Sequence, residues 1–245
     1  MSTAIVVTSG KGGTGKTSVT GGVASCLAAL GNRVLCIDMD IGLRNLDLSL
    51  GMSDRALMDF TDVVEGRCGL SRAVVEHPVI HDLFLLTAPL NPRPIGEAAM
   101  QSLIQEAKRS YDYILMDSPA GLGSGFRLAV CAADRGLVVS TTDPSALRDA
   151  QRTVSELRRT LPGHIHLVMN RVQPKLLRKL HTTIDDAMDT AGLPLLGVIP
   201  EDQAVTLAAG RGQPLILYAR KNAAIAYLNI AKRLTGQSVP VMRIR

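Results

Sequence analysis

A glycine-rich segment directly after the first apolar run restricts the fold of this chain more than any other feature. Residues 4–7 read AIVV, and residues 9–18 read SGKGGTGKTS. Gly10 to Thr17 fit the phosphate-binding pattern G-x-x-x-x-G-K-[ST], which needs a strand before it and a helix after it. The apolar run and the helical periodicity that follows supply both. The segment therefore predicts an α/β domain whose first strand leads into a loop around the phosphates of a nucleotide.

Each part of this loop, the P-loop, has a chemical role. Glycines let the backbone curve so that several N–H groups point at phosphate oxygens, and the dipole of the next helix adds positive potential. Lys16 is expected to reach the β- and γ-phosphates, and the Thr17 hydroxyl to bind Mg²⁺. A dinucleotide-binding G-x-G-x-x-G does not fit, because Gly13 and Gly15 are followed by Ser18. The residues expected to contact the nucleotide here are Gly10, Lys11, Gly12, Gly13, Thr14, Gly15, Lys16, Thr17 and Ser18.

Short apolar runs alternate with longer stretches of helical periodicity along the rest of the chain. The runs are apolar throughout, which indicates strands buried on both faces, and intervening helices indicate right-handed βαβ crossovers. We expect one domain over residues 1–245 with the P-loop NTPase fold, a doubly wound, mostly parallel sheet with helices on both faces. Strands are predicted at residues 4–8, 34–38, 83–87, 113–117, 136–140, 164–170 and 195–199, and helices at 16–30, 56–65, 97–110, 125–133, 145–160, 174–191, 203–211 and 222–234.

Composition adds only broad limits. The chain has 46% apolar and 3% aromatic residues, so the core must consist mainly of aliphatic side chains. The net charge of +5, with basic residues concentrated between 148 and 179, is compatible with nucleic acid, acidic lipid or nucleotide phosphate. The four cysteines form no C-x-x-C, and they are interpreted as reduced thiols of a cytosolic protein. The two close histidine pairs lack further ligands, so zinc is not expected.

Three aspartates follow apolar runs and suggest a metal site. Asp38 and Asp40 end the run CIDMD, and Asp117 ends YILMD. Apolar residues followed by aspartate at a strand end are typical of the Walker B motif, whose carboxylate holds Mg²⁺. Carboxyl ends of parallel strands are also where open α/β sheets bind ligands. Functional roles are therefore favoured for Asp40 and Asp117, although each aspartate alone also fits a helix cap or a turn.

ATP is the favoured nucleotide, because the N-K-x-D pattern that reads guanine is absent.

Lys11 is a second lysine in the P-loop, and it is not needed to bind the phosphates of the chain's own nucleotide. It is interpreted either as solvated charge or as a cation offered to a phosphate, including one held by a second subunit.

The segment KGGTGKT resembles the deviant Walker A motif of the MinD/ParA ATPase family. Further segments resemble the MinD branch of that family in the same order along nearly the whole chain: DMDIGLRNLDLSLG, DSPAG, RDAQR, GVIPEDQAV and GQPLIL. The run DMDIGLRNLD distinguishes this branch best from ParA.

The resemblance implies an ATP-dependent homodimer that sandwiches two ATP molecules and hydrolyses them with Mg²⁺, slowly unless a partner stimulates it. Lys11 would reach the nucleotide of the partner subunit, and Asp40, in switch I, would position or activate the attacking water. Asp38 would support the metal region together with Thr17 and Asp117. The adenine side would be formed by Asn170, Arg171, Pro200, Glu201 and Asp202, and switch II by Asp117, Ser118, Pro119, Ala120 and Gly121.

The same resemblance implies spatial regulation of cell division by septum-site placement, with regulators of the MinC and MinE type. Their expected contact surface comprises Arg44, Asn45, Arg148, Asp149 and Arg152. ParA-like DNA binding in plasmid or chromosome partition remains an alternative, based on the basic residues between 148 and 179. Placement of flagella or pili is another. A cluster-carrying relative is disfavoured, because no close cysteine pair exists.

The C-terminal sequence departs from the family pattern. Gly236 and Pro240 disfavour a helix, and VMRIR suits a strand or an irregular tail more than an amphipathic membrane-binding helix. We therefore expect a cytoplasmic protein, with attachment to the inner face of the cell membrane as the alternative.

Overall fold

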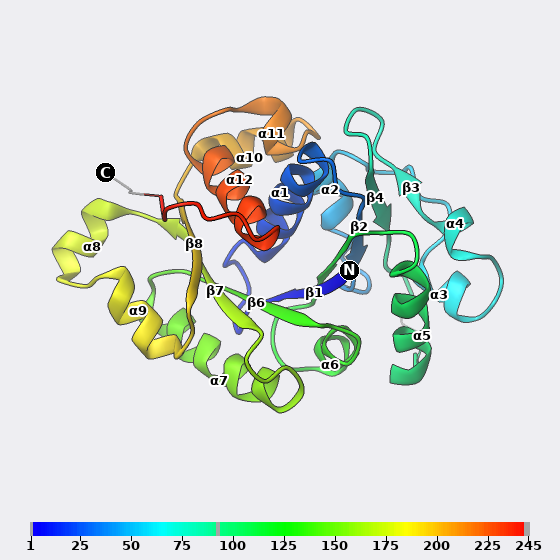
Figure 1. Ribbon diagram of the computed structural model, residues 1–245, viewed down its shortest axis with the longest axis horizontal. Coiled ribbons are helices and arrows are strands. Elements are labelled where there is room, and N and C mark those ends of the chain that lie inside the picture. Colours follow the sequence, from blue (N-terminus) through cyan, green and yellow to red (C-terminus); the bar gives the residue numbers. More distant parts are fainter. Residues whose placement is uncertain (1, 92–93, 243–245) are drawn as a thin grey trace.

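An eight-stranded sheet forms the centre of the protein in the computed structural model, which describes residues 2–91 and 94–242 (Figure 1). The spatial order is β3-β4-β2-β5-β1-β6-β7-β8, and all neighbours are parallel except β3 with β4. The strands are β1 (Thr3–Thr8), β2 (Val34–Asp38), β3 (Val75–Glu76), β4 (Leu83–Leu86), β5 (Tyr113–Asp117), β6 (Arg135–Ser140), β7 (Ile165–Val172) and β8 (Leu195–Pro200). The carboxyl end of β1 therefore lies near the middle of the ligand-binding edge.

Helices cover both faces of this sheet, as the doubly wound prediction requires (Figure 1). One face is covered by α1 (Lys16–Ala29), α2 (Leu46–Leu50), α10 (Gln203–Gly210), α11 (Leu215–Tyr218) and α12 (Ala223–Leu234). The other is covered by α3 (Phe60–Val64), α4 (Leu70–Ala73), α5 (Glu97–Ala107), α6 (Ser124–Val130), α7 (Pro144–Thr160) and α9 (Ile184–Ala191). The remaining helix, α8 (Pro174–Leu180), has no buried residue.

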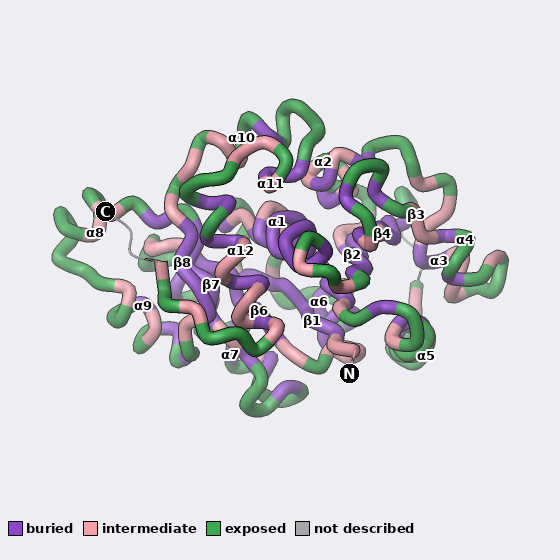
Figure 2. Tube along the Cα trace, turned by 45° about the horizontal axis from the view of Figure 1, so that its top comes forward, coloured by how far each residue is buried: buried purple, intermediate pink, exposed green. Residues whose placement is uncertain are grey.

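The two cores follow from the alternation of side chains along each strand. In β1, Ala4 and Val6 join the core beneath α5 and α7, whereas Ile5 and Val7 join the core beneath α1 and α12. All four side chains are fully buried, which explains why the strand reads as a continuous apolar run. Figure 2 shows the same burial along the central strands and around α1.

Two predicted helices differ most in extent from those in the structure. The helix expected at 56–65 begins only at Phe60, because Asp59 caps it by accepting a hydrogen bond from a backbone N–H of the first turn. The helix expected at 174–191 is broken at His181, whose φ of 50° is left-handed. A new helix begins after Thr183, which forms a capping box with Asp186.

Short elements were not predicted at all: β3, α2, α4 and α11 have five residues or fewer. Such lengths are too short for hydrophobic periodicity to define.

The end of the described chain returns to the body of the protein without forming a helix or strand after α12. Arg233 holds it there, since Nε and Nη2 donate to the Val239 carbonyl at 2.8 and 2.6 Å, and Nη1 donates to the Leu196 carbonyl. Of the segment expected to form a strand or an irregular tail, Val241 and Met242 are irregular, and residues 243–245 lie outside the described residues. Within the described residues, no helix is both long and apolar enough to cross a membrane.

Candidate nucleotide-binding site

The P-loop connects β1 to α1, and its glycines are required by its geometry. Gly13 and Gly15 have φ values of 80° and 84°, which residues other than glycine rarely adopt. A Cβ atom on Gly10 would lie 2.2 Å from the backbone oxygen of Asp149 in α7. The loop is thus packed directly against α7, and substitution of Gly10 would push the two apart.

Two side chains of the β7 end hold the carbonyl groups of the loop. Asn170 Nδ2 donates to the Thr14 carbonyl at 2.8 Å, and Arg171 Nη1 donates to the Gly13 carbonyl at 3.3 Å. Within the described part of the chain, no group accepts a hydrogen bond from the backbone N–H groups of residues 11–15. The carbonyls are therefore bound to protein while the N–H donors remain available, which is the arrangement that binds a phosphate.

Lys16, Thr17 and Asp117 meet at the base of the loop. Lys16 Nζ lies 3.5 Å from Asp117 Oδ1, and the Thr17 hydroxyl donates to Oδ2 at 2.6 Å. The Thr20 hydroxyl, one turn further along α1, donates to Oδ1 at 3.1 Å. Burial raises the pKa of Asp117, while Lys16 and these hydroxyls oppose that rise. Thr20 belongs to no sequence motif and was not predicted, although its spacing of three from Thr17 places both on one helix face.

This cluster fits a magnesium ion by the chemistry of its donors. Mg²⁺ prefers oxygen ligands and is usually bound by one or two protein groups together with phosphate oxygens and water. The Thr17 hydroxyl and the Asp117 carboxylate are such oxygens, and they already lie within hydrogen-bond distance of each other.

Asp38 lies beside Asp117 in the sheet but is engaged differently. Its oxygens accept hydrogen bonds from the backbone N–H groups of Asp40 at 2.9 Å and Leu46 at 3.1 Å. Burial, and next the charge of Asp117, raise the pKa of Asp38 to about 7. Asp38 therefore fixes both ends of the segment 40–46, and its predicted metal role stays a prediction.

Asp40 begins this segment, which we call switch I, and is partly exposed. No hydrogen bond or ion pair engages its carboxylate within the described residues. Its carbonyl accepts hydrogen bonds from the backbone N–H groups of Leu43 and Arg44, at 3.3 and 3.4 Å. The carboxylate is therefore free to interact with a water molecule beyond the carboxyl end of β2.

Switch II follows Asp117 at the end of β5. Ser118 is fully buried, and its backbone N–H donates to the Val7 carbonyl at 3.1 Å. Gly121, with a φ of 85°, donates its N–H to the Ser9 carbonyl at 3.4 Å. Switch II is thus bonded directly to the start of the P-loop. Pro119 and Ala120, the other predicted members, lie between these two contacts.

The residues predicted for the adenine side come together around a cavity of about 150 Å³ next to Gly15. Arg171 Nε donates to Glu201 Oε2 at 2.9 Å, which joins the loops after β7 and β8. Asp202 caps α10 by accepting from the Ala204 N–H at 2.9 Å. The remaining lining residues include the predicted Ser18, Asn170 and Pro200, and the unpredicted Val205, Thr206 and Tyr227, which no sequence motif marked.

Lys11 points away from Lys16 and toward α7. Its Nζ lies 2.7 Å from Ser145 Oγ and 3.1 Å from Asp143 Oδ2, at the start of the helix. Hydrogen bonds from Ser145, followed by Lys11, lower the pKa of Asp143. Lys11 also lines an open cavity of about 440 Å³ with Gly12, Gly13, Pro144 and Arg171, among other residues. The side chain is half exposed and therefore accessible to a second molecule.

The predicted partner surface divides into two parts. Arg148 and Arg152 are exposed on α7, where Arg152 Nη1 lies 3.8 Å from Asp149 Oδ1. Arg44 and Asn45 belong to switch I, after β2. Because β1 lies between β2 and β6 in the sheet, the two parts flank the P-loop from opposite sides.

Cysteines and histidines contribute no metal site. No group of three or more histidine, cysteine or acidic side chains that could hold a metal ion occurs within residues 2–91 and 94–242. Cys26 and Cys36 are buried, and Cys68 and Cys131 are partly exposed free thiols. His77 is buried.

Comparisons with known proteins agree with this geometry. Residues 5–215 match the CobQ/CobB/MinD/ParA nucleotide binding domain. The septum site-determining protein MinD of Synechocystis is 39% identical over 246 residues, which cover 99% of this chain and 92% of that protein. The chain is also similar to a solved MinC:MinD cell division protein complex from Aquifex aeolicus, with a TM-score of 0.93, 37% identity and 99% coverage of both chains. A MinD structure with Mg-ADP from Pyrococcus horikoshii gives a TM-score of 0.83, 29% identity and 96% coverage of both.

Proposed function

Because this chain belongs to the MinD group of the CobQ/CobB/MinD/ParA nucleotide-binding family, we propose that it is an ATPase that regulates the position of the division septum. The observation that carries this proposal is the meeting of Lys16, Thr17 and Asp117 beneath a P-loop with free N–H donors. The geometry of the site and the family of the chain both support the same reaction, hydrolysis of a bound nucleoside triphosphate.

The chain's own residues have distinct roles in this hydrolysis. When bound, Mg²⁺ would neutralise charge on the β- and γ-phosphates, and Thr17 and Asp117 are the groups that would hold it. The Lys16 ammonium has three N–H donors, so it would contact a phosphate in addition to, or in place of, the Asp117 carboxylate that lies 3.5 Å away. Asp40 would orient the attacking water. The nucleotide proposed is ATP, and its base would lie beside Asn170, Arg171, Pro200, Glu201 and Asp202.

We propose that hydrolysis requires a homodimer. The Lys11 ammonium contributes nothing to the phosphate site of its own chain in this conformation, because it is held at α7. In a face-to-face dimer, each Lys11 would approach the nucleotide of the partner subunit and complete its site. Slow turnover of the isolated chain follows from this incompleteness.

The regulators would act on two surfaces, one on α7 and one on switch I. On α7, Arg148, Asp149 and Arg152 lie next to the packing contact between Asp149 and Gly10. On switch I, Arg44 and Asn45 lie next to Asp40. A MinC-type protein is the partner favoured by the similarity to the MinC:MinD complex, and a MinE-type activator is proposed with it.

A cellular experiment tests the function. Deletion of the gene should misplace division septa, the intact gene should restore them, and Lys16→Ala should fail to restore them at equal abundance. Normal septa combined with lost plasmids or displaced appendages would contradict the septum role and support one of the alternatives.

The location proposed is the cytoplasm. Co-sedimentation with anionic vesicles, compared between ATP and ADP, separates this from attachment at the inner membrane face. Duplex DNA at two salt concentrations is the parallel test for the basic residues of α7 and α8, because non-specific DNA binding weakens steeply with salt.

A further inference from the structure

Switch I is held at its middle as well as at its two ends. The ends are fixed by the Asp38 carboxylate. At the middle, the Gly42 N–H donates to the Pro89 carbonyl at 3.2 Å. The Arg44 side chain then reaches the same segment after β4, where Nε donates to the Ala88 carbonyl at 2.5 Å. Switch I therefore rests on a neighbouring loop as well as on its own strand.

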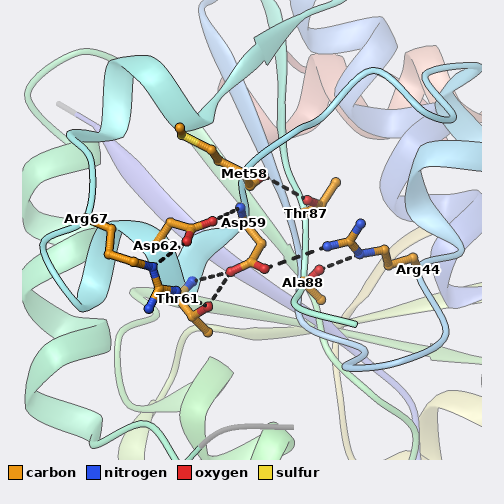
Figure 3. Close-up of polar contacts among 8 residues, drawn as sticks. All are labelled: Arg44, Met58, Asp59, Thr61, Asp62, Arg67, Thr87 and Ala88. Atoms are coloured by element: carbon orange, nitrogen blue, oxygen red, sulfur yellow. Dashed lines mark hydrogen bonds and ion pairs between the residues drawn. The ribbon is translucent and has the colours of Figure 1, made fainter. Parts of the chain in front are cut away.

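Arg44 has a backbone conformation that needs support from its surroundings. Its φ of 43° is in the left-handed region, which is unfavourable for a residue that carries a side chain. Such residues persist where the surrounding contacts define them, and they concentrate at functional sites. The guanidinium provides these contacts, and Figure 3 shows it between Ala88 and Asp59.

Asp59 is the charged partner of Arg44 and is itself rigidly placed. Its Oδ2 lies 3.8 Å from Arg44 Nη2, and both side chains are largely buried. The Asp59 Oδ1 atom accepts from the Thr61 N–H at 2.8 Å, and the Asp59 N–H donates to Asp62 at 2.9 Å (Figure 3). The start of α3 thus presents a fixed carboxylate to switch I.

Arg44 transmits this anchoring to Asp40 through the backbone. The Arg44 N–H donates to the Asp40 carbonyl at 3.4 Å, so the two residues lie on one turn. If Arg44 moves, the peptide group that carries the Asp40 side chain moves with it. A displacement of about 1 Å at a reacting group can lower a rate by about a hundredfold.

We propose that Arg44 and Asp59 are a positioning pair that holds Asp40 at the mouth of the nucleotide site. This proposal rests on the proposed function, in which Asp40 orients the attacking water. It adds the start of α3 to the parts of the protein that affect catalysis. Neither residue is proposed to touch the nucleotide. The separation of 3.8 Å between Arg44 Nη2 and Asp59 Oδ2 is too long for a direct hydrogen bond, so we expect the ion pair to contribute little to global stability.

Two variants separate positioning from folding. Arg44→Gly removes the guanidinium but suits the left-handed backbone. Asp59→Asn replaces the carboxylate oxygen that caps α3 with an amide oxygen, which can accept the same hydrogen bond, and removes the charge that faces Arg44. Lys108→Gln is the matched control, because Lys108 also forms an ion pair, with Asp134, outside switch I. ATP hydrolysis, nucleotide affinity and Tm are measured for all three and for the double variant.

Positioning predicts a loss in kcat without a matching loss of binding. Arg44→Gly should lower kcat by about tenfold and Asp59→Asn by about threefold, with the ATP Kd within about threefold of wild type. The double variant should be no slower than Arg44→Gly alone, because the two residues act as a unit. Multiplied losses in the double variant, or wild-type kcat in both single variants, would contradict the proposal.

Hydrogen exchange keeps the pair testable if hydrolysis itself is not found. Backbone amides of residues 40–46 should exchange faster in both variants than in wild type or Lys108→Gln. Unchanged exchange would overturn the positioning pair even if the protein is an active ATPase. Normal turnover by Asp40→Ala would instead contradict the proposed function, while faster exchange could still support the anchoring of switch I.

Discussion

The ammonium of Lys11 is bound to Ser145 of its own chain, with 2.7 Å between Nζ and Oγ. The same ammonium lies 3.1 Å from the Asp143 carboxylate, and both ion-pair partners are about half exposed. Exposed pairs of this kind contribute little to stability, so they exchange readily for a stronger partner. A phosphate in a second subunit would be such a partner, because it carries more charge than one carboxylate.

Lys11→Ala should therefore bind ATP with an affinity within about fivefold of wild type but form no ATP-dependent dimer, since the contact across subunits is lost. Titration calorimetry gives the affinity and light scattering the mass. Asp143→Asn is the control, because it weakens the resting contact and leaves Lys11 intact. Dimers of normal stability in Lys11→Ala would remove this lysine from the interface.

Lys16→Ala should weaken ATP binding by at least about a hundredfold, because the loop loses its charged contact to the phosphates. The same change leaves the Asp117 carboxylate buried without its nearest cation. The pKa of Asp117 should then rise further, and the variant should lose more stability at pH 8 than at pH 5. Calorimetry and urea unfolding at the two pH values measure both effects. Retained affinity would show that Lys16 does not contact phosphate.

Asp40→Ala should bind ATP normally and lower kcat by about a hundredfold, since its carboxylate is the free acceptor beyond the carboxyl end of β2. Dimers formed with ATP should then persist for longer than those of wild type. Single-turnover hydrolysis and the decay of dimer mass after dilution check the two expectations. Loss of ATP binding in this variant would point to a structural role.

His77 gives the protein a pH dependence that is separate from the nucleotide site. Its Nδ1 accepts from the N–H groups of Val79 and Ile80 at 3.1 and 2.9 Å, so this nitrogen must be unprotonated. Its Nε2 lies 3.0 Å from the Leu50 carbonyl, to which it donates. Burial lowers the pKa of His77 below 6.5.

Because the folded pKa lies below the unfolded value, this contribution to stability is complete above about pH 6.5 and is lost as the pH falls. The free energy of unfolding should fall by at most about 1.4 kcal/mol per pH unit from this group. His77→Gln should show a flatter profile than wild type in urea unfolding between pH 8 and pH 5. Parallel profiles would contradict the role of His77.

The residues proposed for the nucleotide site could be grouped from the sequence because strand ends bring them together. Gly10 to Thr17 form a contiguous motif, and the register pairs Val7 and Asp38 with Asp117 once the strands are parallel. The convergence of Asn170 and Asp202 required the family resemblance, since nothing local links them.

The features that could not be predicted from the sequence depend mainly on contacts between segments far apart in the chain. The functional role proposed for Asp59 could not be predicted, because an aspartate that only caps a helix and one that also pairs with an arginine have the same sequence pattern. The contact of Lys11 with Ser145 spans 134 positions and leaves no periodic trace. The break at His181 was missed because a left-handed histidine has no reliable local signature.

The mass of the protein in solution with Mg-ATP, measured by light scattering against Mg-ADP, tests the proposed switch most directly. An ATP-driven dimer requires the mass to rise from 26.1 kDa with ADP to about twice that value with ATP. Asp40→Ala should hold the larger mass and Lys11→Ala the smaller one. A mass of one chain under saturating ATP, in both wild type and Asp40→Ala, would contradict the dimerisation switch.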